Sequence, residues 1–230
     1  MAEENKNWTV ISLGGSLIYP QELDTKYVEN FVDLLKGRIH EENFAIITGG
    51  GRLARMMQEE LTAKNPAATP DDLDWAGIEA TRKNARIVQN VFGDLAESEI
   101  FMDPHTPILT GKSVLIGGGF KPGHSSDGSA VVLAKTLVAK KLVNLSNIDY
   151  VYTADPRTNP DAVKIENISW ADFRKLLPTE WNPGINAPFD PVAARMAEEL
   201  GLEVVVMNGK NLENLSNYLS GEKFVGTVIH

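Results

Sequence analysis

Apolar positions along the chain fall into short continuous runs separated by longer stretches with helical spacing. Continuous runs at Trp8–Leu13, 44–48 and 114–116 are typical of strands that are buried on both faces of a parallel sheet. Further strands are predicted at 99–102, 142–145, 203–207 and Thr227–Ile229. Seven short strands spread over the whole chain predict one extended sheet.

Helical patterns occupy most of the stretches between these strands. Asp24 is predicted to cap a helix that carries Phe31 and Leu35 on its apolar face. Ser169, with Asp172 three residues later, resembles a capping box. Further helices are expected at 52–61, 77–92, 126–138, 170–177, Pro191–Leu200 and Leu212–Leu219, and loops at 65–74, 146–162 and 178–190. This alternation predicts an α/β fold, a largely parallel sheet covered by helices, with ligands at the carboxyl ends of its strands.

Composition is that of an ordinary globular protein and narrows the function classes. The 230 residues are 43% hydrophobic and 23% charged, which is enough to bury a sizeable core. The net charge of −9 argues against a protein that coats nucleic acid, but not against a phosphorylated small molecule. The absence of cysteine excludes disulfides, thiolate zinc sites and cysteine nucleophiles. Without a signal region or an apolar run of about 18 residues, we expect a cytoplasmic protein with no membrane partner.

Three glycine-rich turns, each placed directly after a predicted strand, carry the strongest chemical signal. They are Gly14-Gly15-Ser16, Gly49-Gly50-Gly51 and Gly117-Gly118-Gly119. A backbone without Cβ atoms can approach a polyanion closely, and a helix that follows offers free N–H groups to phosphate. One such turn is more often structural than functional, but three in one chain indicate a site where several phosphates converge. No dinucleotide-binding G-x-G-x-x-G lies at a strand–helix junction.

Polar neighbours of these turns supply candidate ligand contacts. Arg52 and Arg55 follow the second turn, and guanidinium groups suit phosphate oxygens. After the third turn, Lys121 and His124 lie in a loop rich in glycine and proline, where Ser125 or Ser126 is expected to cap the next helix. The polar loop 146–156 is suited to a nucleotide base and ribose, or is a surface turn.

Asp190 has a structural and a functional interpretation, and the two are compatible. With Pro191 at the first helical position, Asp190 is predicted to be the N-cap of the helix that begins there. A carboxylate at that point could also orient phosphate donors rather than act as a base.

At these residues the chain resembles the amino-acid-kinase superfamily and, within it, the archaeal-type uridylate kinases. The similarity spans nearly the whole chain, from the first glycine turn through the Y-T-A-D-P loop at Tyr152–Pro156 to Gly226-Thr227. It implies a three-layer αβα sandwich that forms a single domain over residues 1–230, with the acceptor bound mainly by 8–140 and the nucleotide donor mainly by 141–230. It also implies transfer of the ATP γ-phosphoryl group to UMP with Mg²⁺ bound through the ATP phosphates, no separate metal site in the protein, and a hexamer built from dimers.

The resemblance also implies a role for individual residues. UMP would be held by the residues that match the family's acceptor motifs: Gly50, Asp74, Lys121, Pro122, Gly123, His124, Ser125 and Ser126. ATP would be held by Gly14, Gly15, Gly51, Arg55, Ser146, Asn147, Tyr152 and Asp155. Asp190, Lys121 and Arg55 would be the catalytic residues.

Three positions depart from the superfamily pattern. Ser12 and Asn144 stand where many superfamily kinases carry lysine, and Tyr150 replaces a common glycine in the nucleotide loop. We hypothesise that Lys121 supplies the missing positive charge. Two alternatives remain: a kinase of the same fold with a carboxylate or isoprenoid-phosphate acceptor, and a nucleotide- or oxyanion-binding protein without turnover.

Overall fold

A seven-stranded, mostly parallel sheet forms the centre of the protein. The computed structural model describes residues 7–107, 109–178 and 187–230, so part of the predicted loop 178–190 lies outside the described residues. The strand order is β3-β2-β1-β4-β8-β9-β7, in which only the β8–β9 pair is antiparallel. The strands are β1 (Trp8–Leu13), β2 (Asn43–Thr48), β3 (Val114–Gly117), β4 (Lys141–Ser146), β7 (Asn167–Ile168), β8 (Glu203–Asn208) and β9 (Thr227–Ile229). The predicted parallel sheet is thus confirmed.

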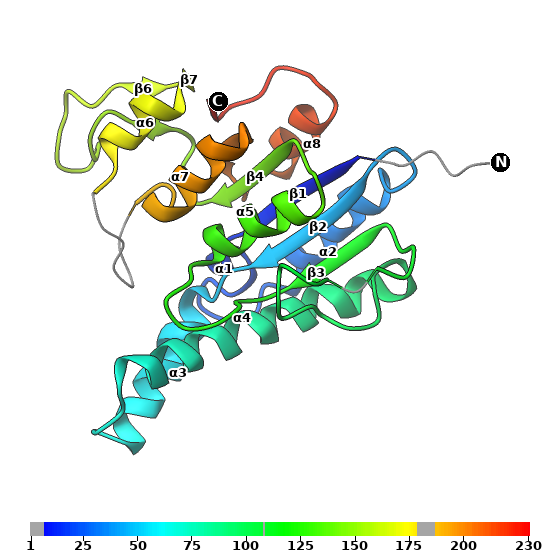
Figure 1. Ribbon diagram of the computed structural model, residues 1–230, viewed down its shortest axis with the longest axis vertical. Coiled ribbons are helices and arrows are strands. Elements are labelled where there is room, and N and C mark those ends of the chain that lie inside the picture. The colour runs from blue at the N-terminus through cyan, green and yellow to red at the C-terminus, as the bar shows by residue number, and fades with distance from the viewer. Residues whose placement is uncertain (1–6, 108, 179–186) are drawn as a thin grey trace.

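Helices cover both faces of this sheet and complete three layers (Figure 1). One face packs against α5 (Ser126–Thr136), α6 (Trp170–Leu176) and α7 (Pro191–Leu200). The other packs against α1 (Gly15–Ile18), α2 (Thr25–Lys36), α4 (Pro70–Phe92) and α8 (Leu212–Leu219). Successive strand residues alternate between these layers, so Val10 lies in the first core cluster and Ile11 in the second. The αβα sandwich is as predicted.

Helix starts follow the capping residues found in the sequence. Asp24 accepts a hydrogen bond from the Tyr27 N–H at 2.9 Å and begins α2, and Asp190 likewise begins α7. At α4, however, the predicted start was wrong. Thr69 and Asp72 form a capping box and Pro70 occupies the first helical position, so the helix begins inside the segment expected to be a loop.

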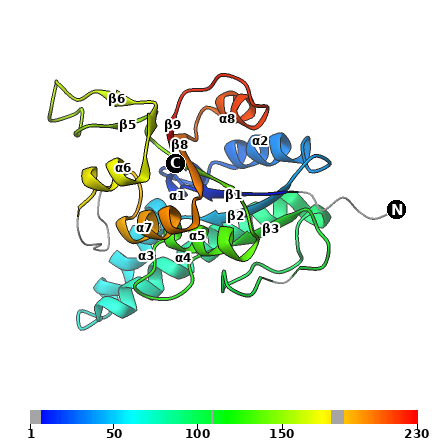
Figure 2. The ribbon, with the colours of Figure 1, turned by 45° about the horizontal axis from the view of Figure 1, so that its top comes forward.

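Other differences arise where short elements depend on tertiary contacts. Residues 99–102 do not form a strand, because Phe101 makes only an isolated bridge to Gly117. The loop 146–162 contains β5 (Val151–Tyr152), which pairs with β6 (Lys164–Ile165) as a separate two-stranded sheet outside the main sheet (Figure 2). Two-residue strands leave no readable periodicity in a sequence.

The helix α3 (Gly51–Lys64) packs along the first half of α4, and the two project together from the body of the molecule (Figure 1). None of its described residues is buried. Within the described part of the chain, no helix is both long and apolar enough to cross a membrane.

Candidate active site

A cavity of about 460 Å³ lies beyond the carboxyl ends of β2 and β3. Its wall contains the N-cap residues of three helices: Gly50 of α3, Ser125 of α5 and Asp190 of α7. The other lining residues are Gly51, Ala54, Gln58, Asp74, Gly77, Ile78, Thr81, Gly119, His124, Ser126, Asp127 and Ala187. The cavity therefore brings together the second glycine turn, the loop after the third turn and Asp190, as the sequence predicts.

The three helix starts each contribute a positive potential to this cavity, and that contribution comes from the backbone. The N-terminal end of a helix carries the equivalent of about half a positive charge on its unpaired N–H groups. At α5 and α7 the cap side chains already pair with one of these N–H groups: Ser125 accepts from the Gly128 N–H and Asp190 from the Ala193 N–H. Gly50 has no side chain to do so. The first turn of α3 is therefore the one best suited to bind an anion.

The first and second glycine turns pack backbone against backbone. A Cβ atom on Gly15 would lie 2.4 Å from the carbonyl oxygen of Gly49 and 2.5 Å from the amide nitrogen of Gly51. Gly51 itself has a φ of +58°, a left-handed conformation that favours glycine. Side chains are thus excluded at both positions, which explains why the two turns consist of glycine.

A pair of carboxylates, the buried Asp190 and the half-buried Asp127, occupies the cavity wall next to the sheet. Asp127 accepts from the Asp190 N–H and from the Ser12 hydroxyl, both at 3.2 Å. Burial raises the pKa of Asp127 to about 6, and the nearby Asp190 charge contributes in the same direction, while the hydrogen bond from the Asp190 N–H opposes it. Asp190 accepts from the Ala193 N–H at 2.7 Å. Asp190 is therefore both a helix cap and a cavity residue.

The two positions that depart from the superfamily's lysines lie beside each other in the sheet. Ser12 of β1 and Asn144 of β4 are register partners, so their side chains share one face. Ser12 donates to Asp127 on this face, and the Asn144 amide is 3.4 Å from the Pro188 carbonyl oxygen. Neutral groups thus occupy both positions next to the carboxylate pair.

Asp74 and the loop after the third turn are joined by a hydrogen bond. The Asp74 carboxylate accepts from the Gly123 N–H at 2.9 Å. The His124 and Phe120 rings pack in a T-shaped arrangement, with ring centroids 5.5 Å apart. Gly123 and its neighbour Pro122 do not line the cavity, but this contact fixes the loop that presents His124, Ser125 and Ser126 to it.

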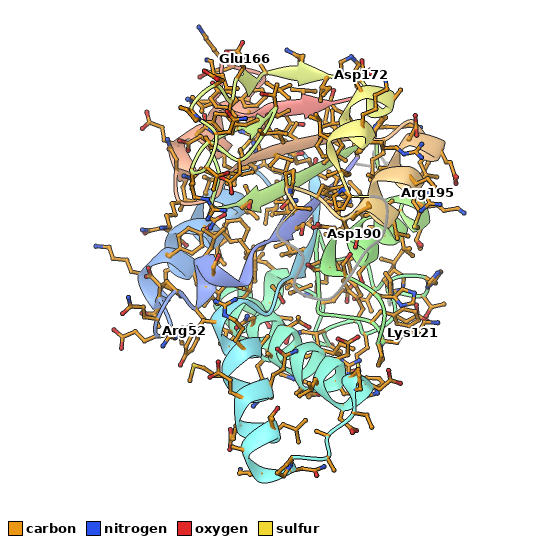
Figure 3. The ribbon with its side chains drawn as sticks, turned by 90° about the vertical axis from the view of Figure 1, so that its left-hand side faces the viewer. Arg52, Lys121, Glu166, Asp172, Asp190 and Arg195 are labelled. Atoms are coloured by element: carbon orange, nitrogen blue, oxygen red, sulfur yellow. The ribbon has the colours of Figure 1, made fainter. Side chains whose placement is uncertain are left out.

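The predicted cations lie outside the cavity lining. Among the described residues that line it, none is lysine or arginine, whereas three are aspartates. Lys121 is exposed, with its ammonium group 5.0 Å from the centre of the Phe120 ring. Figure 3 shows Arg52 on the left and Lys121 on the right of the view, with Asp190 above both. Arg55 is also exposed.

The residues predicted for the adenosine part of ATP line another part of the structure. Ser146 ends β4, Asn147 follows it, and Tyr152 lies in β5. Asp155 forms an ion pair with Arg157 at 2.8 Å, and this contact lowers the pKa of Asp155 to about 2. Gly14, of the first turn, donates to the Leu145 carbonyl at the end of β4. These residues do not line the described cavity.

Sequence reasoning missed several residues of the cavity wall, Asp127, Thr81 and Gln58 among them. Asp127 was visible as an acidic residue at the start of a predicted helix, next to two serines already selected. Thr81 and Gln58 lie within α4 and α3, where a polar residue gives no sign that it faces a cavity.

Comparison with known proteins identifies the class to which this fold and site belong. The model of the amino acid kinase family matches residues 7–208, and the chain belongs to this family. It is 33% identical over 227 residues to the uridylate kinase of Methanobrevibacter smithii, an alignment that covers 96% of this chain and 97% of that protein. It is 30% identical over 225 residues to the uridylate kinase of Natronomonas pharaonis, covering 96% and 97%.

Solved structures agree with this assignment. The uridylate kinase of Archaeoglobus fulgidus superimposes with a TM-score of 0.82 at 29% identity, covering 96% of this chain and 99% of that one. The UMP kinase of Bacillus anthracis superimposes with a TM-score of 0.76 at 18% identity, covering 98% and 96%, and it supports the fold alone.

Proposed function

We propose that the protein is a uridylate kinase, which transfers the γ-phosphoryl group of ATP to UMP and yields ADP and UDP. An oxygen of the UMP phosphate attacks the γ-phosphorus while the bond to the bridging oxygen of ADP breaks. The observation that carries the proposal is the convergence of three helix N-termini on one cavity beside two aspartates. Full-length relatives named as uridylate kinases support the same activity.

The acceptor is proposed to bind in the described cavity. Gly50 and the N-cap of α5 would meet the UMP phosphate with backbone N–H groups. Asp74 would accept hydrogen bonds from the ribose, and the loop Lys121–Ser126 would close over the nucleotide. Because His124 and Ser126 line the cavity while Lys121 does not, we assign the direct contacts to the former two.

The donor is proposed to bind across the first two turns and the end of β4. Gly14, Gly15, Gly51 and Arg55 would meet the ATP phosphates, and Ser146, Asn147, Tyr152 and Asp155 the adenosine. This division gives residues 8–140 mainly to the acceptor and 141–230 mainly to the donor. Asp190, with Arg55 and Lys121, would act at the reacting centre. Full turnover by Lys121→Ala at saturating substrates would remove Lys121 from this set.

Magnesium fits the donor chemistry of the site. Mg²⁺ prefers carboxylate and phosphate oxygens and usually keeps several waters, so it needs only one or two protein ligands. Asp127 and Asp190 supply such oxygens at the cavity, although the described residues include no group of three or more metal ligands. When bound with ATP, the ion would neutralise charge on the transferring phosphoryl group. Asp127 and Asp190 would hold it there together with the ATP phosphates, which adds protein ligands to a metal that the resemblance alone implies is bound through ATP.

Phosphoryl transfer demands little from a protein base, since positioning and charge stabilisation supply most of the catalysis. The backbone N–H groups of the glycine turns are fixed before substrate binds, so they stabilise developing charge without rearrangement. The proposed activity thus suits a cavity built from backbone dipoles.

The assembly is proposed to be a hexamer, a trimer of dimers. The absence of buried residues on α3, together with the exposed Met56 and Trp75, leaves a projecting surface available for another subunit. Analytical ultracentrifugation of the purified protein measures this directly, and a monomer at micromolar concentration would contradict it.

A coupled assay with ATP, Mg²⁺ and a panel of acceptors tests the activity. We expect UMP to be phosphorylated at least about 100-fold more efficiently than AMP or isopentenyl phosphate, because the cavity would hold the whole nucleotide. Preferred turnover of isopentenyl phosphate would indicate another acceptor class. Turnover of none of them would overturn the kinase function.

A further inference from the structure

Two buried polar side chains of α4 lie directly behind the glycine turns. Asn84 is completely buried, and its amide Nδ2 donates to the Gly49 carbonyl at 2.8 Å and lies 3.4 Å from the Gly50 carbonyl. Asn84 does not line the cavity. Its contacts are therefore with the backbone of the second turn.

Thr81, one helical turn earlier, holds the third turn in the same way. Its Oγ1 accepts from the Gly119 N–H at 2.6 Å and donates to the Ile78 carbonyl at 2.6 Å. The Thr81 carbonyl accepts from the Thr48 hydroxyl at 2.7 Å, which ties the end of β2 to the same point of the helix. The Thr81 hydroxyl thus both donates and accepts a hydrogen bond within the protein.

The hydrogen bond from Asn84 to the Gly49 carbonyl determines the direction of the next backbone N–H. Across a planar trans peptide, the C=O and the following N–H point in opposite directions. No described peptide bond is cis. Because Asn84 draws the Gly49 carbonyl towards α4, the Gly50 N–H points away from α4. The same relation holds for the Gly50 carbonyl and the Gly51 N–H.

Asn84 also carries a cost that an apolar residue would avoid. Its Oδ1 is buried and, among the described residues, has no hydrogen-bond partner. Leaving a buried acceptor unpaired is unfavourable by about 1–3 kcal/mol in general. The amide at this position is explained if its N–H donor is needed to hold the Gly49 carbonyl, which a leucine side chain could not do.

We propose that Asn84 and Thr81 are positioning residues for phosphoryl transfer: Asn84 orients the backbone N–H groups of the second glycine turn, and Thr81 fixes the third turn by accepting from the Gly119 N–H. The proposal rests on the kinase function proposed above. Asn84 acts through Gly50 and Gly51, and Thr81 through Gly119. The pair couples both turns to one rigid helix, so the donor and acceptor phosphates are bound in a fixed relation.

Gln89 provides a matched control on the same helix. It is also a buried amide of α4 that donates to a backbone carbonyl, that of Glu97, at 2.7 Å, but it touches neither turn. Asn84→Leu and Gln89→Leu therefore remove comparable hydrogen bonds. We expect Asn84→Leu to lower kcat by about 10-fold or more, with a smaller change in KM, and Gln89→Leu to change kcat by less than about 2-fold.

Thr81 gives a second, independent comparison. Thr81→Val has nearly the same shape without the hydroxyl and is expected to lower kcat by about 10-fold, whereas Thr81→Ser keeps the hydroxyl and is expected to retain most turnover. Equal losses in the two variants would overturn the role of the hydroxyl. If Asn84→Leu does not fold, Asn84→Ala and Gln89→Ala take the place of the leucine pair.

Amide resonances of isotope-labelled protein separate this proposal from the kinase function. Asn84→Leu should shift the Gly50 and Gly51 amide resonances, and Gln89→Leu should leave them in place. Unmoved resonances, or equal kcat losses in the two variants, would overturn the positioning role even if the wild type phosphorylates UMP. If Asn84→Leu shifts these resonances but the wild-type protein does not phosphorylate UMP, the kinase function alone would be overturned.

Discussion

Asp190 combines a structural role with a proposed chemical role in one carboxylate, and the two can be separated. It caps α7 by accepting from the Ala193 N–H, and it lines the cavity. Asparagine is as good an N-cap as aspartate but carries no charge. We therefore expect Asp190→Asn to keep its thermal stability while kcat falls by about 100-fold, since a charged group at the reacting centre is lost.

The alanine variant at the same position provides the comparison. Asp190→Ala loses the cap as well, so its free energy of unfolding should fall by about 1 kcal/mol. Denaturant unfolding and steady-state kinetics on both variants measure the two effects. Normal kcat in Asp190→Asn would mean that the residue is only a cap.

Asp127 predicts how stability depends on pH. Its pKa is about 6 in the folded protein, against about 3.9 for an ordinary aspartate. Between these values the folded state binds more protons than the unfolded state, so the contribution of Asp127 to stability falls as pH rises from about 4 to about 6. Above pH 6 the ionised, buried carboxylate destabilises the fold.

Replacing this carboxylate by its neutral isostere removes that pH dependence. We expect Asp127→Asn to be more stable than the wild type by on the order of 2 kcal/mol at pH 8, and to differ little near pH 4. Urea unfolding at pH 4, 5, 6 and 8 measures the difference. Parallel pH profiles for the two proteins would contradict the raised pKa.

At the scale of elements, the packing of the first glycine turn against the second leaves no room for a side chain. A Cβ on Gly15 would lie within 2.5 Å of three backbone atoms. Gly15→Ala must displace one of the two turns, so we expect a loss of about 2 kcal/mol in the free energy of unfolding and a large loss of kcat. Gly37→Ala is the control, because there a Cβ has ordinary contacts of 3.4 Å or more and φ is −62°. Full activity in Gly15→Ala would show that the turns tolerate separation.

The turn between α5 and β4 contains a strained valine. Val138 has a φ of +55° and is 73% exposed, so its β-branched side chain adopts a left-handed conformation without packing in return. Val138→Gly is expected to raise the melting temperature by about 2–4 °C, equivalent to about 1 kcal/mol. Val163→Gly, at another exposed valine (62%) without positive φ, should lower it. Differential scanning calorimetry of both variants tests the sign, and a fall in both would contradict the strain.

The sequence predicted most elements because its apolar runs and capping residues act locally. Trp8–Leu13 and Pro191–Leu200 were predicted to the residue, since a buried strand and a Pro-initiated helix each depend on their own residues. The start of α4 was missed although Thr69 and Asp72 form a capping box, because the surrounding prolines and aspartates resemble a loop.

Most of the cavity residues that were selected from the sequence lie in turns or at helix starts; Asp74, selected through the resemblance, lies within α4. Glycine turns and caps have local signatures, so Gly50, Ser125 and Asp190 were found. Thr81 and Asn84 lie in the interior of a helix and reach the turns only through packing in three dimensions. Proximity in sequence to a glycine turn does not bring Arg55 or Lys121 to the wall of this cavity, so their assignment to the phosphates stays a prediction.

At the scale of the whole molecule, the distribution of charge is unusual for a protein that binds phosphates. The chain has a net charge of −9, and the cavity wall contains Asp74, Asp127 and Asp190 but, among its described residues, no lysine or arginine. Backbone dipoles act over a short range, whereas the net charge acts over a longer one. The molecule should therefore bind nucleotide phosphates firmly at contact without attracting them from a distance.

Because the attraction is short-range and the repulsion long-range, kcat/KM for UMP should not fall when salt is added, unlike that of an enzyme with a cationic cleft. Raising the ionic strength from 10 to 100 mM shortens the screening length from about 30 Å to about 10 Å, which weakens long-range repulsion between the protein and UMP but leaves contact hydrogen bonds intact. At fixed free Mg²⁺, we expect kcat/KM for UMP to stay constant or to rise by about 2-fold over this range, whereas a cationic cleft would lose several-fold. The same series with Arg55→Gln and Lys121→Gln is the control. A steep fall in the wild type that disappears in either variant would mean that this exposed cation attracts the substrate, and that the positive charge of the site extends beyond its backbone.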